Sequence, residues 1–300
     1  MNIADEEEYT GFTFKDAAYE YRLVAFVDLL GFVKYLEERD LKNVLDVLET
    51  FHKDMSKESF HERFAKSKYA VQNDDFKVID PVRLQDRRVT VFSDLVVISY
   101  RGTKEYLEWN FKELIDTIHE AQNMILSKGV LLRGGITYEK LYHNERYCVG
   151  PGLVRAYYLE SKVANFPRII IDPEISRKSP FNKFCSDHIN LHEQDGIWAT
   201  NEFEAIKQLV EVNEQDLKSP ELHEFRANMY IKLKSLNEII ENGIASGVDK
   251  VVEKMSWMVP QYNEALVKVT STLGNDFSIV DPKGEDEFYK TLLAVKKIEI

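Results

Sequence analysis

The chain has 300 residues and a formal net charge of −12, with 44% hydrophobic and 30% charged residues. This balance is typical of a globular protein that forms one large domain or two ordinary ones. The acidity disfavours non-specific binding to nucleic acid or to an anionic membrane.

The first residues, "MNIADEEEYT", are acidic and polar, unlike a secretory signal or a mitochondrial transit peptide. No apolar run approaches the ~20 residues that span a bilayer. The two cysteines, Cys148 and Cys185, lack the spacing of a disulfide framework or a zinc site. We therefore expect a cytoplasmic protein with two reduced thiols that binds neither nucleic acid nor membrane.

In chain order, the apolar residues 22–28 predict a buried strand that ends at a carboxylate, Asp28. "GFVKYLEERD" then predicts a short helix, and the apolar spacing over residues 41–66 predicts a longer one. Residues 68–88 read as a loop-rich connection.

The stretch "RVTVFSDLVVISY" at 88–100 predicts two strands that form a hairpin broken at Ser93 and Asp94. Residues 103–127 predict an amphipathic helix with Thr103 as its N-cap.

The stretches "GVLLRGGITYEKLYH", "YCVG" and "FPRIIID" predict three more strands, and "PGLVRAYYLESKVA" a helix with Pro151 near its start. The predicted order over 22–171 is therefore β-α-α-β-β-α-β-β-α-β. It is typical of an α+β fold with a ferredoxin-like, mostly antiparallel sheet and helices on one face.

After residue 172 the pattern becomes helical. "HEQDGIWATN" predicts one further strand, and residues 202–211 and 221–270 predict helices, with a break near Gly243 and Gly247. We divide the chain into an acidic segment (1–21), a core (22–172) and a mostly helical extension (173–300) packed on the core.

Asp28 and Asp94 are the strongest candidates for functional residues, because each ends an apolar strand and precedes a turn. If the two strands are neighbours, the carboxylates meet at one sheet edge, where a divalent cation would relieve their repulsion. The alternative is that Asp28 caps a helix and Asp94 only stabilises a hairpin turn.

Two further features suggest a site without establishing one. Gly134 and Gly135 lie inside a predicted strand, which suggests that a ligand or another backbone comes close. Arg155 lies near a helix start, either as a phosphate contact or as an ordinary surface arginine.

Four stretches, "VAFVDLLGF", "RVTVFSDLVVIS", "RGGITYEKLY" and "VGPGLVRAYYLES", resemble the catalytic-domain motifs of class III nucleotide cyclases and occur in the same order. The match covers roughly residues 22–171. "GPGLVRAYYLESKVANFPRIIID" and the helical tail look most like the bacterial anti-phage pyrimidine cyclases of the Pycsar systems. The resemblance implies a class III cyclase core with a C-terminal helical extension. It also implies synthesis of cyclic UMP or cyclic CMP, from UTP or CTP, as an alarm messenger read by a separate effector protein.

The resemblance assigns the reacting end of the substrate. Asp28 and Asp94 match the aspartates that bind two Mg²⁺ or Mn²⁺ ions per active site. The backbone of the turn at residues 29–32 matches the segment that contacts the triphosphate; its members are Leu29, Leu30, Gly31 and Phe32.

The resemblance also assigns the base. Arg88 falls where purine cyclases have a base-selecting lysine, and Tyr147 where adenylate cyclases have an aspartate. A bulky Tyr147 would shrink the pocket toward a pyrimidine, and an arginine donor suits the second carbonyl of uracil better than the amino group of cytosine. We therefore favour UTP over CTP.

The chain departs from the purine cyclases on one helix, where Val154 and Tyr158 replace the asparagine and arginine that assist the transition state. Arg155 lies beside Val154, so we assign the catalytic roles to Arg155 and Tyr158. In class III cyclases the metal aspartates and the base-reading residues come from different subunits, which implies a homodimer with shared active sites.

Two rivals remain. One is a catalytically degenerate cyclase-like module that binds a nucleotide or a partner. The other is a two-metal palm enzyme of the polymerase kind, for which the acidic chain lacks a basic groove.

Overall fold

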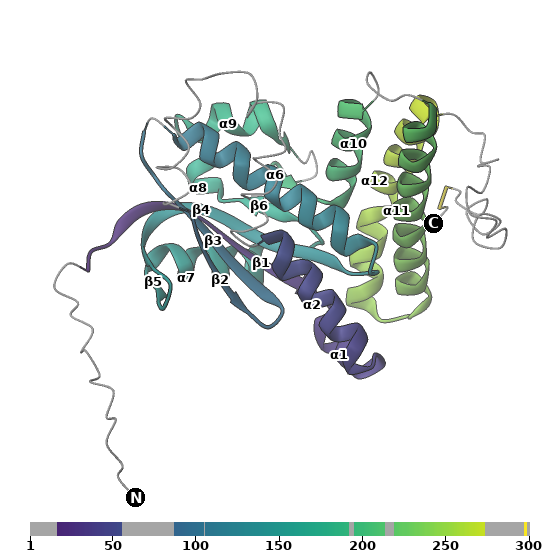
Figure 1. Cartoon of the computed structure of the whole chain (residues 1–300), viewed down its shortest axis with the longest axis horizontal. Helices are drawn as coiled ribbons and strands as arrows, with labels where there is room; N and C mark the ends of the chain where they lie inside the picture. Colours follow the sequence, from purple (N-terminus) through teal and green to yellow (C-terminus); the bar gives the residue numbers. More distant parts are fainter. Residues whose placement is uncertain are drawn as a thin grey trace, which may run out of the picture.

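The computed structural model describes residues 17–55, 87–104, 106–191, 195–213, 219–273 and 297–298. One twisted sheet has helices packed on it, and a group of helices stands beside one end of the sheet (Figure 1). The elements up to the last predicted core strand are β1 (Glu20–Leu30), α1 (Phe32–Glu38), α2 (Leu41–Met55), β2 (Arg88–Phe92), β3 (Leu95–Arg101), α6 (Leu107–Leu126), β4 (Leu131–His143), β5 (Cys148–Val149), α7 (Pro151–Tyr158), the π-helix η1 (Leu159–Val163) and β6 (Ile169–Ile171).

The second part of the chain is mostly helical. Two short strands in it continue the sheet, because β8 pairs with β6 and β7 pairs with β8. Its elements are α8 (Pro173–Ser176), α9 (Phe181–His188), β7 (Asn190–Leu191), β8 (Trp198–Thr200), α10 (Glu202–Asn213), α11 (Ser219–Ala245) and α12 (Asp249–Leu273).

The strand order is β2-β3-β1-β4-β6-β8-β7, with β5 paired to β4 beside this path. β1 lies between β3 and β4 and runs antiparallel to both. The β4–β6 pair is parallel, and the other pairs are antiparallel. The predicted α+β class, with a mostly antiparallel sheet and C-terminal helices, is confirmed.

Over the described residues between 22 and 171 the elements follow the predicted order, and residues 56–66 of the second predicted helix lie outside the described residues. The break between the last two helices falls at residues 246–248. The predicted cap Thr103 is wrong. The backbone makes a turn there, in which the Tyr106 amide donates to the Thr103 carbonyl, and the helix begins at Leu107. The predicted connection at 68–88 lies outside the described residues up to 86.

The alternation of β1 decides which side chains face the site. Leu23, Ala25 and Val27 point into a large core made with α2, α6 and α9. Val24 and Phe26 point to the opposite face, where α7 covers them. Because successive strand residues point to opposite faces, Asp28 shares the α7 face with Val24 and Phe26.

The C-terminal helices have a second apolar core, formed by α10, α11 and α12 together with residues from the end of the sheet. Leu131 is part of this core, and Leu30 packs against it. The helical group is thereby joined to the end of the sheet at which β1 finishes and β4 begins. Among the described helices, none combines the length and the apolarity that a membrane crossing requires.

Candidate active site

Asp28 and Asp94 come together as predicted. Asp28 is paired with Leu95 in the β1–β3 ladder, and Asp94 precedes Leu95 in the hairpin turn. The Leu29 amide donates to the Asp94 carbonyl at 3.0 Å, which ties the turn to β1. The turn is tight because Ser93 adopts a left-handed φ of 52°.

Glu160 and Arg133 complete a charged cluster with the two aspartates. Arg133 lies opposite Asp28 in the β1–β4 ladder. Its guanidinium forms an ion pair with Glu160, and its Nη2 lies 3.8 Å from the Asp28 carboxylate. Glu160 is buried, at 4% exposure, in the π-helix η1. We missed Glu160 in the sequence; its only signal was the "LES" motif, because nothing local places a helix residue beside a strand.

The environment of Asp28 resists its ionisation. Burial raises the pKa of this carboxyl to about 7, with further contributions from the negative charges of Glu160 and Asp94, while Arg133 opposes the shift. One arginine, already paired with Glu160, does not compensate three neighbouring carboxylates. The cluster therefore favours an additional cation.

A divalent ion fits this requirement. Within the described ranges, no three His, Cys, Asp or Glu side chains gather closely enough to form a complete metal site. Mg²⁺ does not need one, since it often takes one or two carboxylates and completes its shell with water and substrate phosphates. The residues that would hold it are Asp28 and Asp94.

In the turn after β1, the side chains of Leu29 and Phe32 point into the core, so the backbone is the part left for a ligand. Leu29 and Phe32 are buried, at 1% and 4% exposure, so their side chains belong to the core. Gly31 has a φ of 82°, and no atom lies within 4 Å of a Cβ built on it. Glycine is thus required by the backbone conformation rather than by space.

The paired glycines of β4 serve packing between backbones. A Cβ on Gly134 would lie 2.5 Å from the Phe26 carbonyl oxygen. A Cβ on Gly135 would lie 2.8 Å from the Ala156 oxygen and 3.2 Å from the Glu160 nitrogen. Gly135 lets α7 and η1 approach β4, which brings Glu160 to the site, whereas Gly134 leaves room for the backbone of β1.

Arg155 and Tyr158 do not join the charged cluster of the two aspartates with Glu160. Arg155 makes a bidentate contact with Asp172, with Nε and Nη2 at 2.8 and 2.6 Å from its oxygens, and lies 3.3 Å from Glu174. Asp172 holds the pKa of Arg155 above its usual value. Tyr158 is 48% exposed, with the Arg155 guanidinium 5.6 Å from its ring centroid.

Arg88 lies toward the other end of the sheet. It borders a cavity of about 170 Å³ that is also lined by Arg22, Arg101 and His143. Glu20 forms ion pairs with Arg22 and Arg101, whereas Arg88 has no hydrogen bond or ion pair with any described residue.

Tyr147 lines a neighbouring cavity of about 390 Å³, and both cavities are bordered by Ala18 and Tyr142. The structure thus brings Arg88 and Tyr147 to adjacent cavities and separates them from Asp28.

The buried side chain of His143 lines the smaller of these two cavities, and we did not predict it from the sequence. Its ring nitrogens contact the Ser99 hydroxyl at 2.8 Å and the Thr90 hydroxyl at 2.9 Å. Burial lowers the pKa of His143 to about 4, assisted by the positive charges of Arg22 and Arg88. The imidazole is therefore neutral at physiological pH.

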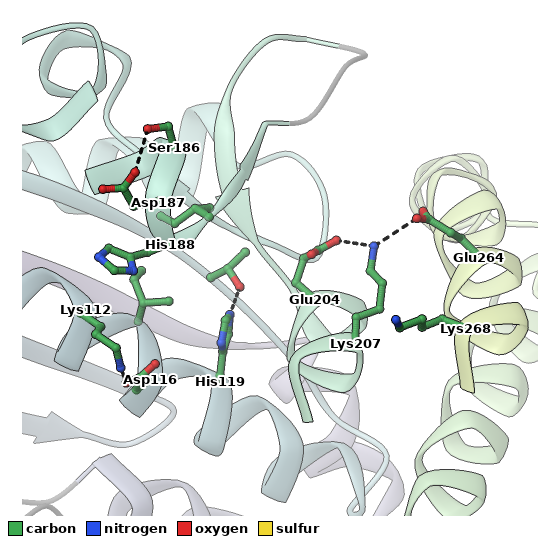
Figure 2. A pocket seen from close by; sticks show the side chains of 13 residues that line it. Lys112, Asp116, His119, Ser186, Asp187, His188, Glu204, Lys207, Glu264 and Lys268 are labelled. Atoms are coloured by element: carbon green, nitrogen blue, oxygen red, sulfur yellow. Dashed lines mark hydrogen bonds and ion pairs between the residues drawn. The ribbon is translucent and has the colours of Figure 1, made fainter. Parts of the chain in front are cut away.

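A cavity of about 470 Å³ lies between α6, α9, β8, α10 and α12 (Figure 2). It contains none of the predicted site residues. Its charges are largely neutralised within the wall, where Lys112 pairs with Asp116, and Lys207 lies 2.8 and 3.4 Å from Glu204 and Glu264. We therefore place the candidate active site at Asp28 and Asp94 rather than here.

No family model and no curated protein matches the sequence. Structural matches include the guanylyl cyclase Cya2, with 13% identity, a TM-score of 0.37, and coverage of 61% of this chain and 92% of that chain. The catalytic core of a rhodopsin-guanylyl cyclase with converted specificity, in complex with ATPαS, has 14% identity, a TM-score of 0.42, and coverage of 62% and 98%. A bacterial light-regulated adenylyl cyclase has 12% identity, a TM-score of 0.35, and coverage of 61% and 91%.

Proposed function

We propose that the chain is a pyrimidine nucleotide cyclase that converts UTP or CTP into a 3′,5′-cyclic monophosphate and pyrophosphate. The 3′-oxygen of the substrate attacks its own α-phosphorus, the bond to the β-phosphate oxygen breaks, and the hydroxyl proton leaves to solvent. The product serves in the cytoplasm as a messenger in anti-phage defence and is read by a separate effector protein. The motif order of the sequence supports this assignment.

The carboxylate pair of Asp28 and Asp94 carries the proposal. The two carboxylates lie at one sheet edge, and the pKa of Asp28 is raised to about 7. A bound divalent cation would relieve the repulsion between them. Bound Mg²⁺ or Mn²⁺ would lower the pKa of the attacking hydroxyl and neutralise charge on the triphosphate. The backbone of residues 29–32 lies beside this pair and would orient the phosphates.

The base would be read by Arg88 and Tyr147. The guanidinium of Arg88 borders a cavity and has no hydrogen bond or ion pair with the described part of the chain, and the neutral His143 ring lies in the same wall. An arginine donor favours the uracil edge, so UTP is the preferred substrate.

Arg88 is remote from Asp28 of its own chain. It pairs with Ser99, which pairs with Val24, so it lies two strands away and four residues back along β1. Four residues are about 13 Å in the strand direction. We therefore infer a homodimer in which each site takes its aspartates from one subunit and its base-reading residues from the other.

One observation favours a second candidate, a non-catalytic cyclase-like module. Arg155, assigned to the transition state, is engaged by Asp172 and so already has a structural partner. In the catalytic account Arg155 acts from the second subunit, and Tyr158, exposed on the same helix, lies beside it.

Incubation with ATP, GTP, CTP and UTP in the presence of Mg²⁺ or Mn²⁺, followed by chromatography, tests the proposal. We expect a cyclic pyrimidine monophosphate and pyrophosphate, with more product from UTP than from CTP. A preference for ATP or GTP would contradict the base assignment, and nucleotide binding without product would favour the non-catalytic module.

A further inference from the structure

The C-terminal helix α12 packs at the end of the sheet that carries the carboxylate cluster. Val251 and Leu30 pack against the same apolar core, which contains Leu131 and Met258. Leu30 is two residues beyond Asp28 on β1 and, by the alternation of the strand, on the same face. The first turns of α12 are therefore anchored at the end of the sheet that carries the candidate site.

A second contact fixes the same part of α12 against η1. The rings of Phe166 and Trp257 stack with their centroids 4.7 Å apart. Phe166 follows η1, the element that carries Glu160. Lys254 is three residues before Trp257 and three after Val251, so the helical repeat places it on the face of α12 that these contacts hold against the core.

The electrostatics of Lys254 agree with this placement, because the charges of Arg133 and Glu160 both act on its ammonium. Burial lowers the pKa of Lys254, as do the positive charges of Arg133 and Lys250, while Glu160 raises it.

Lys254 is not merely the counter-ion of Glu160. Glu160 is already paired with Arg133, and no described residue forms an ion pair within 4 Å of Lys254. In addition, the Nε of Arg133 is buried without a hydrogen-bond partner among the described residues. Two cations therefore lie near Glu160 with unused hydrogen-bonding capacity, an arrangement that suits a polyanion.

We propose that Lys254 is a substrate-binding residue whose ammonium binds the terminal phosphates of the nucleoside triphosphate held at Asp28 and Asp94. This inference rests on the proposed function and adds to it a contact from outside the predicted core. The helical extension would then complete the site and favour a triphosphate over a monophosphate.

Equilibrium binding of UTP and of UMP, with Ca²⁺ replacing Mg²⁺ to prevent turnover, tests this role. Lys254→Ala should weaken UTP binding about tenfold or more, since a charge-assisted hydrogen bond is lost, and should leave UMP binding unchanged. Lys254→Arg should restore most of the UTP affinity. The matched control is Lys268→Ala, because Lys268 lies on the same helix but lines the remote cavity.

The outcomes separate the two proposals. An unchanged UTP affinity in Lys254→Ala, or an equal loss for UTP and UMP, overturns the role of Lys254 even if the wild type makes a cyclic nucleotide. A wild type that selects UTP over UMP through Lys254 without cyclising it supports this inference and contradicts the proposed function. A wild type that binds neither nucleotide overturns both. If thermal melting shows that Lys254→Ala is unfolded, Lys254→Gln, which keeps the aliphatic stem, takes its place.

Discussion

The two ends of the sheet carry opposite charge on the same face. At one end Asp28, Asp94 and Glu160 gather around Arg133; at the other, three arginines border the cavity beside His143. Arg22 and Asp28 lie on one strand, six residues and about 20 Å apart. The acidic end is suited to a cation with phosphates, and the basic end to a neutral base with carbonyl groups. In the proposed function each end is half of a site, and two copies placed end to end would combine the halves.

The largest expected effect comes from the acidic end. Asp28→Asn and Asp94→Asn should each abolish turnover while the protein stays folded, because an amide does not replace a metal-binding carboxylate beside phosphates. Chromatographic assay of the cyclic product, with circular dichroism as the check on folding, measures this. Asp116→Asn, which alters a surface ion pair in the remote cavity, should keep full activity. Wild-type product formation by either aspartate variant would contradict the two-metal account.

Removing the guanidinium of Arg155 should have the next largest effect. Arg155→Ala should raise the activation barrier by about 2–4 kcal/mol, the range for one preorganised electrostatic donor, and Arg155→Lys should not restore the rate fully. Asp172→Asn is the comparison, because it removes the structural partner and keeps the guanidinium. If both variants lose stability and activity in parallel, Arg155 is a structural residue only.

The free energy of unfolding should also depend on pH, because a buried glutamate lies close to the acidic end of the sheet. Glu202 begins α10, and its Oε1 accepts a hydrogen bond from the Leu132 amide at 2.9 Å. Burial raises its pKa from 4.5 to about 7. Since the folded pKa exceeds the unfolded one, the protonated group stabilises the fold below about pH 4.5, and that stability is lost as the pH rises toward 7.

Glu202→Gln cannot ionise and escapes this loss. We expect it to exceed the wild type in free energy of unfolding by about 3 kcal/mol at pH 8 and by much less at pH 5, because each pKa unit corresponds to about 1.4 kcal/mol. Urea unfolding at the two pH values measures the difference. Glu204→Gln, on the same helix, is the control. A difference that is equal at both pH values would show that Glu202 keeps one protonation state.

The basic end predicts the smallest effect. Arg88→Ala should change the ratio of turnover on UTP and CTP by more than tenfold, about 1.4 kcal/mol, because a contact to the base edge is lost. Steady-state rates on both substrates give the ratio. Arg101→Ala should leave the ratio of the two rates unchanged, even if both rates fall. Arg101 borders the same cavity but is paired with Glu20. An unchanged ratio in Arg88→Ala would place the base elsewhere.

The sequence predicted most of the fold because its signals are local. The apolar run of β1, the hairpin at Ser93 and Asp94, and the glycine turn after β1 each lie within a few residues. The meeting of Asp28 with Asp94 followed from the single assumption that their strands are neighbours.

The remaining parts of the candidate site depend on packing between distant segments. Glu160 reaches Asp28 because Gly135 lets the π-helix approach β4, and His143 depends on hydroxyls from two other strands. Lys254 lies in the helical tail that contributed to the resemblance, but no local signal places it beside the core. Arg155 looked like a free phosphate contact in the sequence, because its partner Asp172 lies at the end of a strand seventeen residues on.

Mixing an inactive variant with an impaired one tests the shared site most directly. In a dimer of Asp28→Asn with Arg88→Ala, one site carries both substitutions and the other carries neither. An equal mixture that exchanges subunits should therefore recover about a quarter of the wild-type rate on UTP, since about half of the dimers are mixed and each has one intact site. A mixture no more active than the sum of the two variants measured alone would contradict an active site assembled from opposite ends of two subunits.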